Sequence, residues 1–145
     1  MDETQTTVEH ERCVQLSKYF REEGVPNELI DGTDAFHICV GNVSWGEQDF
    51  YVLIDDSYCV SISTLLIVSI EELPHETLLE VCNAINQNHK WLKASQYEDS
   101  NNVIDLELTI PIIIDGWDYL FCTLAKSFMS STNKAFDTAR KIIEA

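Results

Sequence analysis

The fold is indicated by one stretch, Leu78-Leu79-Glu80-Val81-Cys82-Asn83-Ala84-Ile85-Asn86-Gln87-Asn88-His89-Lys90-Trp91-Leu92-Lys93-Ala94, where a helix-like run passes directly into a strand-like run. Apolar offsets of three and four predict a helix that opens at Pro74 and buries Leu78, Val81, Cys82, Ile85 and His89. Asparagine is a poor helix former, because its amide competes for nearby backbone groups. We therefore expect Asn83 and Asn86 to be buried amides that fasten the end of this helix to strand backbone.

Upstream of this stretch, the pattern predicts one helix and three strands. Apolar residues near helical spacing run from Val8 to about Glu23, and Gly24 and Pro26 then end the run. Three runs rich in β-branched and aromatic residues follow, at about Ala35 to Val43, Asp49 to Asp55 and Tyr58 to Val68. Short polar segments separate these runs, which favours an antiparallel meander.

Downstream, two further strands and a closing helix complete the pattern. Lys90 to Glu98 and Asn102 to Ile114 predict a second hairpin, and a long helix follows Gly116, with Ser130-Ser131 as the place for a bend. The order is α-β-β-β-α-β-β-α, which predicts an α+β fold with a five-stranded antiparallel sheet and helices packed on one face. A chain of 145 residues suits a single domain, residues 1–145, with residues 1–7 as a disordered tail.

Composition narrows the classes of partner. The chain carries 25 acidic and 9 basic residues, a formal net charge of -16. Nucleic acids and anionic lipid surfaces are bound through lysine and arginine, so this charge disfavours both and favours basic protein partners. No apolar stretch approaches the roughly 20 residues that a membrane-spanning helix needs. Five scattered cysteines, an odd number, indicate a reducing, cytoplasmic compartment.

The sequence contains no complete catalytic or metal-binding motif. His10 with Cys13 lacks a second ligand pair, and the turn Asp99-Ser100-Asn101-Asn102 begins like a calcium loop without its central glycine or closing glutamate. His37 and Cys39 share a strand face, but a free cysteine is more often a small buried apolar residue than a nucleophile. We therefore predict a non-enzyme with no cofactor. The alternative is a small-ligand or metal-binding sensor, or an enzyme, whose site is assembled from non-local residues.

A candidate interface comes from the third strand run. Leu65-Leu66-Ile67-Val68 is apolar without alternation, which predicts that both faces of the sheet are covered there. A second subunit would supply this cover, so we expect a homodimer. Tryptophans near turns are further anchors for a protein interface. The candidate interface residues are Leu65, Ile67, Trp45 and Trp117.

The pattern as a whole resembles a known family. Val60 to Ile70 leads through Leu73-Pro74 to a leucine-rich helix that carries Ile85-Asn86, and a strand hairpin and an Asp115-Gly116 step into the last helix follow. In this respect the chain is similar, from about Val8 onward, to the YbjN family of candidate bacterial sensory transduction regulators, within the type III secretion chaperone-like fold. That family often carries a glycine just before its fourth strand, where this chain has His89-Lys90.

The resemblance implies a role without catalysis. Secretion chaperones of that fold are acidic homodimers that hold client segments against apolar grooves. Together with the net charge, this predicts a protein-binding, chaperone-like or regulatory module whose client presents basic or apolar segments. No nucleic acid and no membrane is expected among its partners.

Overall fold

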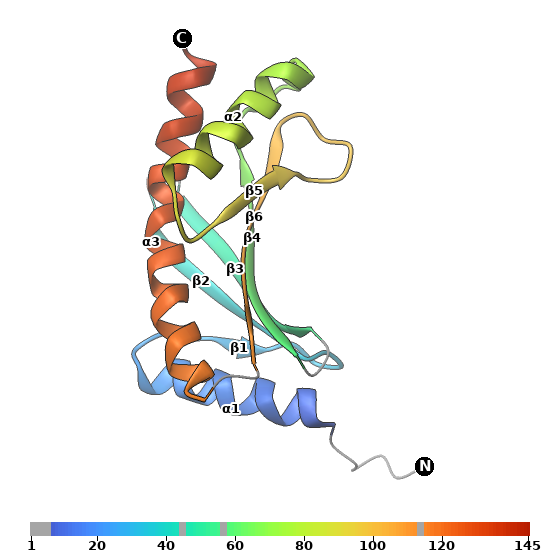
Figure 1. Cartoon of the computed structure of the whole chain (residues 1–145), viewed down its shortest axis with the longest axis vertical. Coiled ribbons are helices and arrows are strands. Elements are labelled where there is room, and N and C mark those ends of the chain that lie inside the picture. Colours follow the sequence, from blue (N-terminus) through green and yellow to red (C-terminus); the bar gives the residue numbers. More distant parts are fainter. Residues whose placement is uncertain (1–6, 44–45, 56–57, 113–114) are drawn as a thin grey trace.

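The computed structural model describes residues 7–43, 46–55, 58–112 and 115–145 of the chain (Figure 1). Three helices and six strands follow one another as α1 (Val8–Glu22), β1 (Glu28–Leu29), β2 (Ala35–Val43), β3 (Gly46–Asp55), β4 (Cys59–Ile67), α2 (His75–Asn88), β5 (Lys93–Gln96), β6 (Val103–Pro111) and α3 (Trp117–Ile143). The predicted α+β class and element order are confirmed, and the two-residue strand β1 is an addition to the five predicted strands. Gly116 enters α3 with a positive φ of 75°, which glycine adopts without a steric penalty.

The six strands form one antiparallel sheet in the order β1-β2-β3-β4-β6-β5. Strands β2, β3 and β4 are the predicted meander. After β4 the chain forms α2 and returns as the short edge strand β5, and β6 then lies between β5 and β4. Pro111 ends β6 opposite Cys59, a strand-end position at which a residue without an N–H disturbs the sheet least.

The helices cover one face of this sheet. Figure 1 shows α3 (orange to red) along the length of the sheet, with α1 at the end near the N-terminus and α2 at the opposite end. Aromatic rings join the layers: Phe20 of α1 meets Phe36 of β2 edge-on at 5.3 Å and Phe121 of α3 at 6.0 Å. Phe50 of β3 contacts Phe128 of α3 in the same edge-on manner, with ring centroids 6.0 Å apart.

The strands bury every second residue. In β2, Phe36 and Ile38 face the helices and Cys39 faces outward. In β4, Leu66 is buried, whereas Leu65 and Ile67 lie on the other face and are exposed. The unbroken apolar run in β4 therefore does not reflect cover on both faces, because no helix of the described residues lies over the second face.

Near the end of α2, the side chain of Asn86 forms the hydrogen bonds to β5 that a neighbouring strand would otherwise form. Its Nδ2 donates to the carbonyl oxygen of Ala94 at 2.9 Å, and its Oδ1 accepts from the N–H of Ala94 at 2.7 Å. Ala94 is buried in the edge strand β5, so this amide satisfies the two backbone groups that β6 does not pair. The side chain therefore ties the helix to the sheet edge.

Two other expectations for α2 are wrong. Neither asparagine is a buried amide, because Asn83, one turn after exposed Leu79, and Asn86, one turn after buried Cys82, are both exposed. His89 is not a member of the buried helical stripe, since it lies in extended conformation just beyond the end of α2. Its Nε2 lies 3.2 Å from Thr138 Oγ1 on α3, and partial burial, with nearby Lys134, lowers the pKa of its imidazole.

The polar turn between β5 and β6 is bound to the segment before α2. Asn102 donates from Nδ2 to the Ser69 carbonyl at 3.0 Å, and the Asn101 N–H donates to Glu72 Oε2 at 2.7 Å. His75 Nδ1 lies 2.9 Å from Asn101 Oδ1. The side chains that resembled the start of a calcium loop thus take part in hydrogen bonds between two segments of the protein. Within the described residues, no group of three or more His, Cys, Asp or Glu side chains is placed to hold a metal ion.

Candidate protein-binding face

The sheet face turned away from the helices, called the open face below, displays apolar side chains. Tyr51 and Leu53 of β3 are 45% and 42% exposed, and Leu65 and Ile67 of β4 are 42% and 64% exposed. Helices in the described part of the chain lie over the opposite face (Figure 1). Contiguous exposed apolar surface on a sheet is typical of an interaction site, since single exposed residues are common but clusters are not.

The strand register gathers these residues. Ile67 lies opposite Val103 of β6, and Leu65, on the same face two residues earlier, lies opposite Asp105. On the next strand, Tyr51 lies opposite Ser63 of β4. Directly opposite residues on one face have Cβ atoms only about 5 Å apart, so Val103 lies beside Ile67, and Tyr51 joins Leu65 and Ile67 in the lining of one cleft.

Carboxylates surround this patch. They belong to outward residues of β3 and β6, namely Glu47, Asp49, Asp55, Asp105 and Glu107. Lys93 of β5 lies opposite Glu107. Partial burial raises the pKa of Asp105, Glu107 raises it further, and Lys93 partly offsets the shift. Because burial and Glu107 both disfavour the charged form of Asp105, a cation brought to this face would stabilise the carboxylate.

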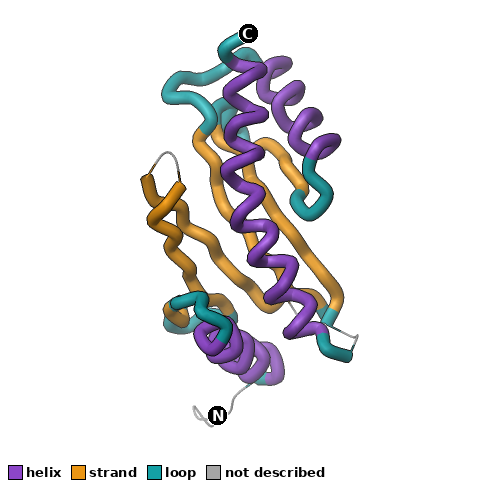
Figure 2. Tube along the Cα trace, turned by 90° about the vertical axis from the view of Figure 1, so that its left-hand side faces the viewer, coloured by secondary structure: helices purple, strands orange, loops and turns teal. Residues whose placement is uncertain are grey.

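The sheet opens between β3 and β4 at one end of the patch. The pairing of these strands runs from Asp55 with Cys59 to Tyr51 with Ser63. Figure 2, viewed from the helical side, shows β2 and β3 diverging from β4 and β6 beyond this point, with α3 crossing in front of the opening. The strands therefore separate where Asp49 and Leu65 would otherwise have paired.

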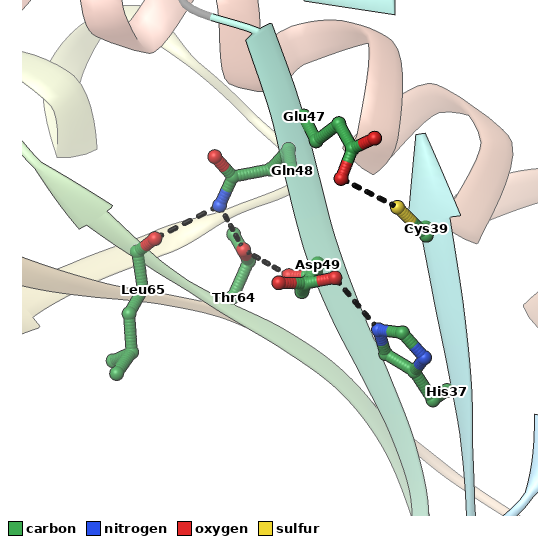
Figure 3. Close-up of polar contacts among 7 residues, drawn as sticks. All are labelled: His37, Cys39, Glu47, Gln48, Asp49, Thr64 and Leu65. Carbon is green, nitrogen blue, oxygen red and sulfur yellow. Dashed lines mark hydrogen bonds and ion pairs between the residues drawn. The ribbon is translucent and has the colours of Figure 1, made fainter. Parts of the chain in front are cut away.

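Two side chains join the separated strands (Figure 3). Gln48 of β3 donates from Nε2 to the Leu65 carbonyl at 2.8 Å and also to the hydroxyl of Thr64. The Thr64 hydroxyl donates in turn to the Asp49 carbonyl. Both residues are buried, so their polar groups replace backbone pairing that the divergence removes. This polar junction fixes the width of the opening.

A cleft of about 440 Å³ lies at this opening. Tyr51, Leu65 and Ile67 of the open face line it, and Phe136 of α3 contributes from the helical layer. Gln48 of the polar junction also lines it, as do Glu47 and Asp49. The cleft is therefore apolar with an acidic rim on the β3 side, and it connects the open face with the helix behind the sheet.

The polar junction gives a stability prediction. Thr64→Val keeps the shape of the side chain but removes the hydroxyl that bonds to Gln48 and to the Asp49 carbonyl. We expect the free energy of unfolding to fall by about 1–3 kcal/mol, the usual cost of leaving a buried polar group without its partner. Urea denaturation followed by circular dichroism measures this loss.

The matched control is Thr109→Val on the open face. Thr109 is exposed, and its hydroxyl bonds to Glu107 two residues away on the same strand. We expect a change within about 0.5 kcal/mol, as is usual for surface substitutions. If both valine variants lost the same stability, the hydroxyl of Thr64 would have no special role in holding β3 and β4.

His37 and Cys39 lie beside the cleft on β2 and do not form a catalytic pair. His37 Nε2 lies 2.7 Å from Asp49 Oδ1, whereas Cys39 Sγ donates to Glu47 Oε2 at 3.8 Å (Figure 3). Desolvation by neighbouring groups raises the pKa of the Cys39 thiol, and Glu47 and Asp49 raise it further. A nucleophilic cysteine requires the opposite shift. The expectation that Cys39 is a buried packing residue is wrong, since its side chain is exposed on the open face.

The remaining candidate residues lie apart from one another. Trp117, at the start of α3, is half-buried and packs against the core, so the structure gives it no place on the open face. Trp45 lies outside the described residues. Asn83 lines a separate depression between α2 and the end of α3, together with Leu79 and Ile142. Cys13, Cys82 and Cys122 are buried in the core, where burial raises the pKa of each thiol, that of Cys13 to about 11.

Comparison with known proteins bears on the fold. No protein-family model matches the chain, and no curated protein matches it either. Among solved structures, the chain is similar to the crystal structure of YbjN from E. coli, described as a candidate transcription regulator, with a TM-score of 0.56 over 85% of this chain and 87% of that one. The two sequences are 11% identical, so the likeness shows the fold alone. The resemblance read from the sequence is therefore confirmed at the level of the fold.

No helix of the described residues combines the length and the apolar character that crossing a bilayer requires.

Sequence reasoning found part of this site. It singled out Leu65 and Ile67, but it missed Tyr51, Gln48, Thr64 and Phe136. Alternation in β3 carried a usable signal, because Tyr51 and Leu53 fall at outward positions between buried residues. The contribution of Phe136 had no local signal, since it depends on where α3 crosses the opening between β3 and β4.

Proposed function

We propose that this chain is a non-enzymatic protein-binding module that holds a segment of a partner protein against its open face. The observation that carries this proposal is the exposure of Tyr51, Leu53, Leu65 and Ile67 together on a sheet face that no described helix covers. Burying such side chains contributes about 25 cal/mol for each Å² of apolar surface removed from water. A regulatory role for this binding is the reading that the fold neighbour supports.

The charge of the face identifies the kind of partner. Five carboxylates surround the patch, at Glu47, Asp49, Asp55, Asp105 and Glu107, and the whole chain carries a net charge of -16. A segment that alternates basic and apolar residues complements both the patch and its rim. Charge complementarity of this kind accelerates association and excludes acidic competitors.

A second copy of the chain is the other occupant to consider. In a symmetric dimer the same patch lies on both sides of the interface, so the carboxylates of one copy would face those of the other. This repulsion favours a basic partner over self-association through the open face. Homodimerisation stays a prediction, and the molecular mass of the protein, measured by light scattering, tests it.

The proposal is tested with a labelled synthetic peptide that alternates lysine and leucine. We expect fluorescence anisotropy to show saturable binding that weakens as salt is added, because salt screens exposed charges. A peptide that alternates glutamate and leucine should not bind. Replacing Leu65 and Ile67 together by aspartate should weaken binding about tenfold or more, since residues at the centre of a patch carry most of the affinity.

Leu79→Asp is the matched control. Leu79 is 44% exposed, similar to the 42% exposure of Leu65, but it lies on α2 away from the open face. We expect this variant to bind the lysine–leucine peptide as the parent chain does. Equal loss in the control, or full binding by the Leu65 and Ile67 variant, would refute the assignment of the open face. A dimer that the double variant converts to monomer would assign this face to a second copy instead.

A further inference from the structure

We infer that the cleft between β3 and β4 receives one apolar side chain of the bound segment, while an adjacent lysine or arginine faces Glu47 and Asp49. This inference rests on the proposed function and specifies where that segment is anchored. The rest of the open face is a pleated surface, whereas the cleft connects it with Phe136 in the helical layer. A side chain that enters it therefore contacts two layers of the protein.

The walls of the cleft suit an apolar occupant. Leu65 and Ile67 line the cleft on the β4 side, and Tyr51 lines it on the β3 side. All three side chains are exposed to solvent. Phe136 is half-buried and packs against the core. A side chain inserted among these four residues would be enclosed by apolar groups, and enclosed anchors near the centre of a patch are the usual hot spots of an interface.

The cleft is fixed before binding. Gln48 and Thr64 bridge β3 and β4 through bonds to the Leu65 and Asp49 carbonyls, so the opening does not have to form when the partner arrives. A preformed site avoids part of the ordering cost of association. The volume of about 440 Å³ falls within the range of about 300–1,000 Å³ that is usual for ligand sites.

The carboxylates at the edge of the cleft determine which kind of residue lies next to the inserted apolar side chain. Glu47 and Asp49 are outward residues of the same strand, and both line the cleft. In Figure 3 their carboxylates lean toward β2, where Cys39 and His37 contact them. A basic residue beside the anchor would reach these carboxylates from the solvent side. The cleft thus favours an apolar residue flanked by lysine or arginine over an apolar residue alone.

The test varies both the size of the cleft and the size of the peptide side chain that enters it. Three lysine-rich peptides differ only in a central alanine, leucine or tryptophan, and their affinities are measured for the parent chain and for Phe136→Ala. We expect the parent to prefer leucine to alanine by about tenfold. Phe136→Ala deepens the cleft, so the ratio of tryptophan to leucine affinity should rise by about tenfold.

Leu53→Ala is the control, because Leu53 lies on the open face but does not line the cleft. It should weaken the leucine and tryptophan peptides equally and leave their ratio unchanged. Thermal unfolding verifies that each variant is folded, and Phe136→Leu replaces Phe136→Ala if the latter is not. If the peptides bind but the ratio of tryptophan to leucine affinity is the same for Phe136→Ala as for the parent chain, the insertion of a side chain into the cleft is refuted. The open face then remains the proposed binding site. If no peptide binds the parent chain, both proposals fail.

Discussion

Replacing Phe20 by alanine is expected to lower the free energy of unfolding by about 3–5 kcal/mol, the range for deleting a buried aromatic ring. Phe20 is fully buried and joins three elements, because its ring lies 5.3 Å from that of Phe36 in β2 and 6.0 Å from that of Phe121 in α3. Its removal leaves a cavity where α1 meets the sheet and α3. Urea denaturation at equilibrium, followed by circular dichroism, measures the loss.

The control for this prediction is Tyr119→Ala. Tyr119 is also an aromatic residue of a helix, but it is 64% exposed on α3. We expect its replacement to change stability by no more than about 0.5 kcal/mol. A loss below about 1 kcal/mol for Phe20→Ala would mean that α1 contributes little to the core, contrary to the ring contacts described above.

The second large effect is expected at Asn86. Asn86→Ala removes both hydrogen bonds to Ala94 and leaves the N–H and carbonyl of a buried strand residue without these partners. The expected loss is about 2 kcal/mol, although alanine is the better helix former and offsets part of the cost. Because β5 is a short edge strand, hydrogen exchange at the Ala94 amide should accelerate more than exchange in β4.

Asn83→Ala distinguishes this role from a general effect of asparagine in a helix. Asn83 is exposed on the same helix and lines the depression beside Leu79 and Ile142, away from the Ala94 backbone that Asn86 binds, so its replacement should leave stability unchanged or raise it slightly. Equal losses at the two positions would contradict the tie between α2 and β5. If Asn86→Leu instead left stability unchanged and abolished peptide binding, Asn86 would belong to the binding site.

The main elements of the fold could be predicted because their signals are local. Offsets of three and four place α1, α2 and α3, and β-branched runs place β2, β3, β4 and β6. Strand β1 could not be recognised, since two residues are too few for a periodic pattern. Helical phase would have separated Asn86 from Asn83, because Asn86 follows buried Cys82 by four residues and Asn83 follows exposed Leu79 by four.

The candidate site was less accessible to prediction. The apolar run at Leu65 and Ile67 indicated an interface, but the same run also fits a strand covered on both faces. Which reading holds depends on where α1, α2 and α3 pack, and this is a tertiary property. The polar junction of Gln48 and Thr64 arises only where β3 and β4 diverge, so no residue pattern within either strand reveals it.

The most direct test of the open face is a titration with the lysine–leucine peptide, followed by the backbone amide signals in two-dimensional NMR. If the segment binds where we propose, the largest shift changes fall at Tyr51, Leu65 and Asp105, on the three strands β3, β4 and β6. The amides of Leu79 on α2 and Val14 on α1 should shift little. Changes concentrated on α1 or α2, with the signals of β3, β4 and β6 unmoved, would contradict a binding role for the open face.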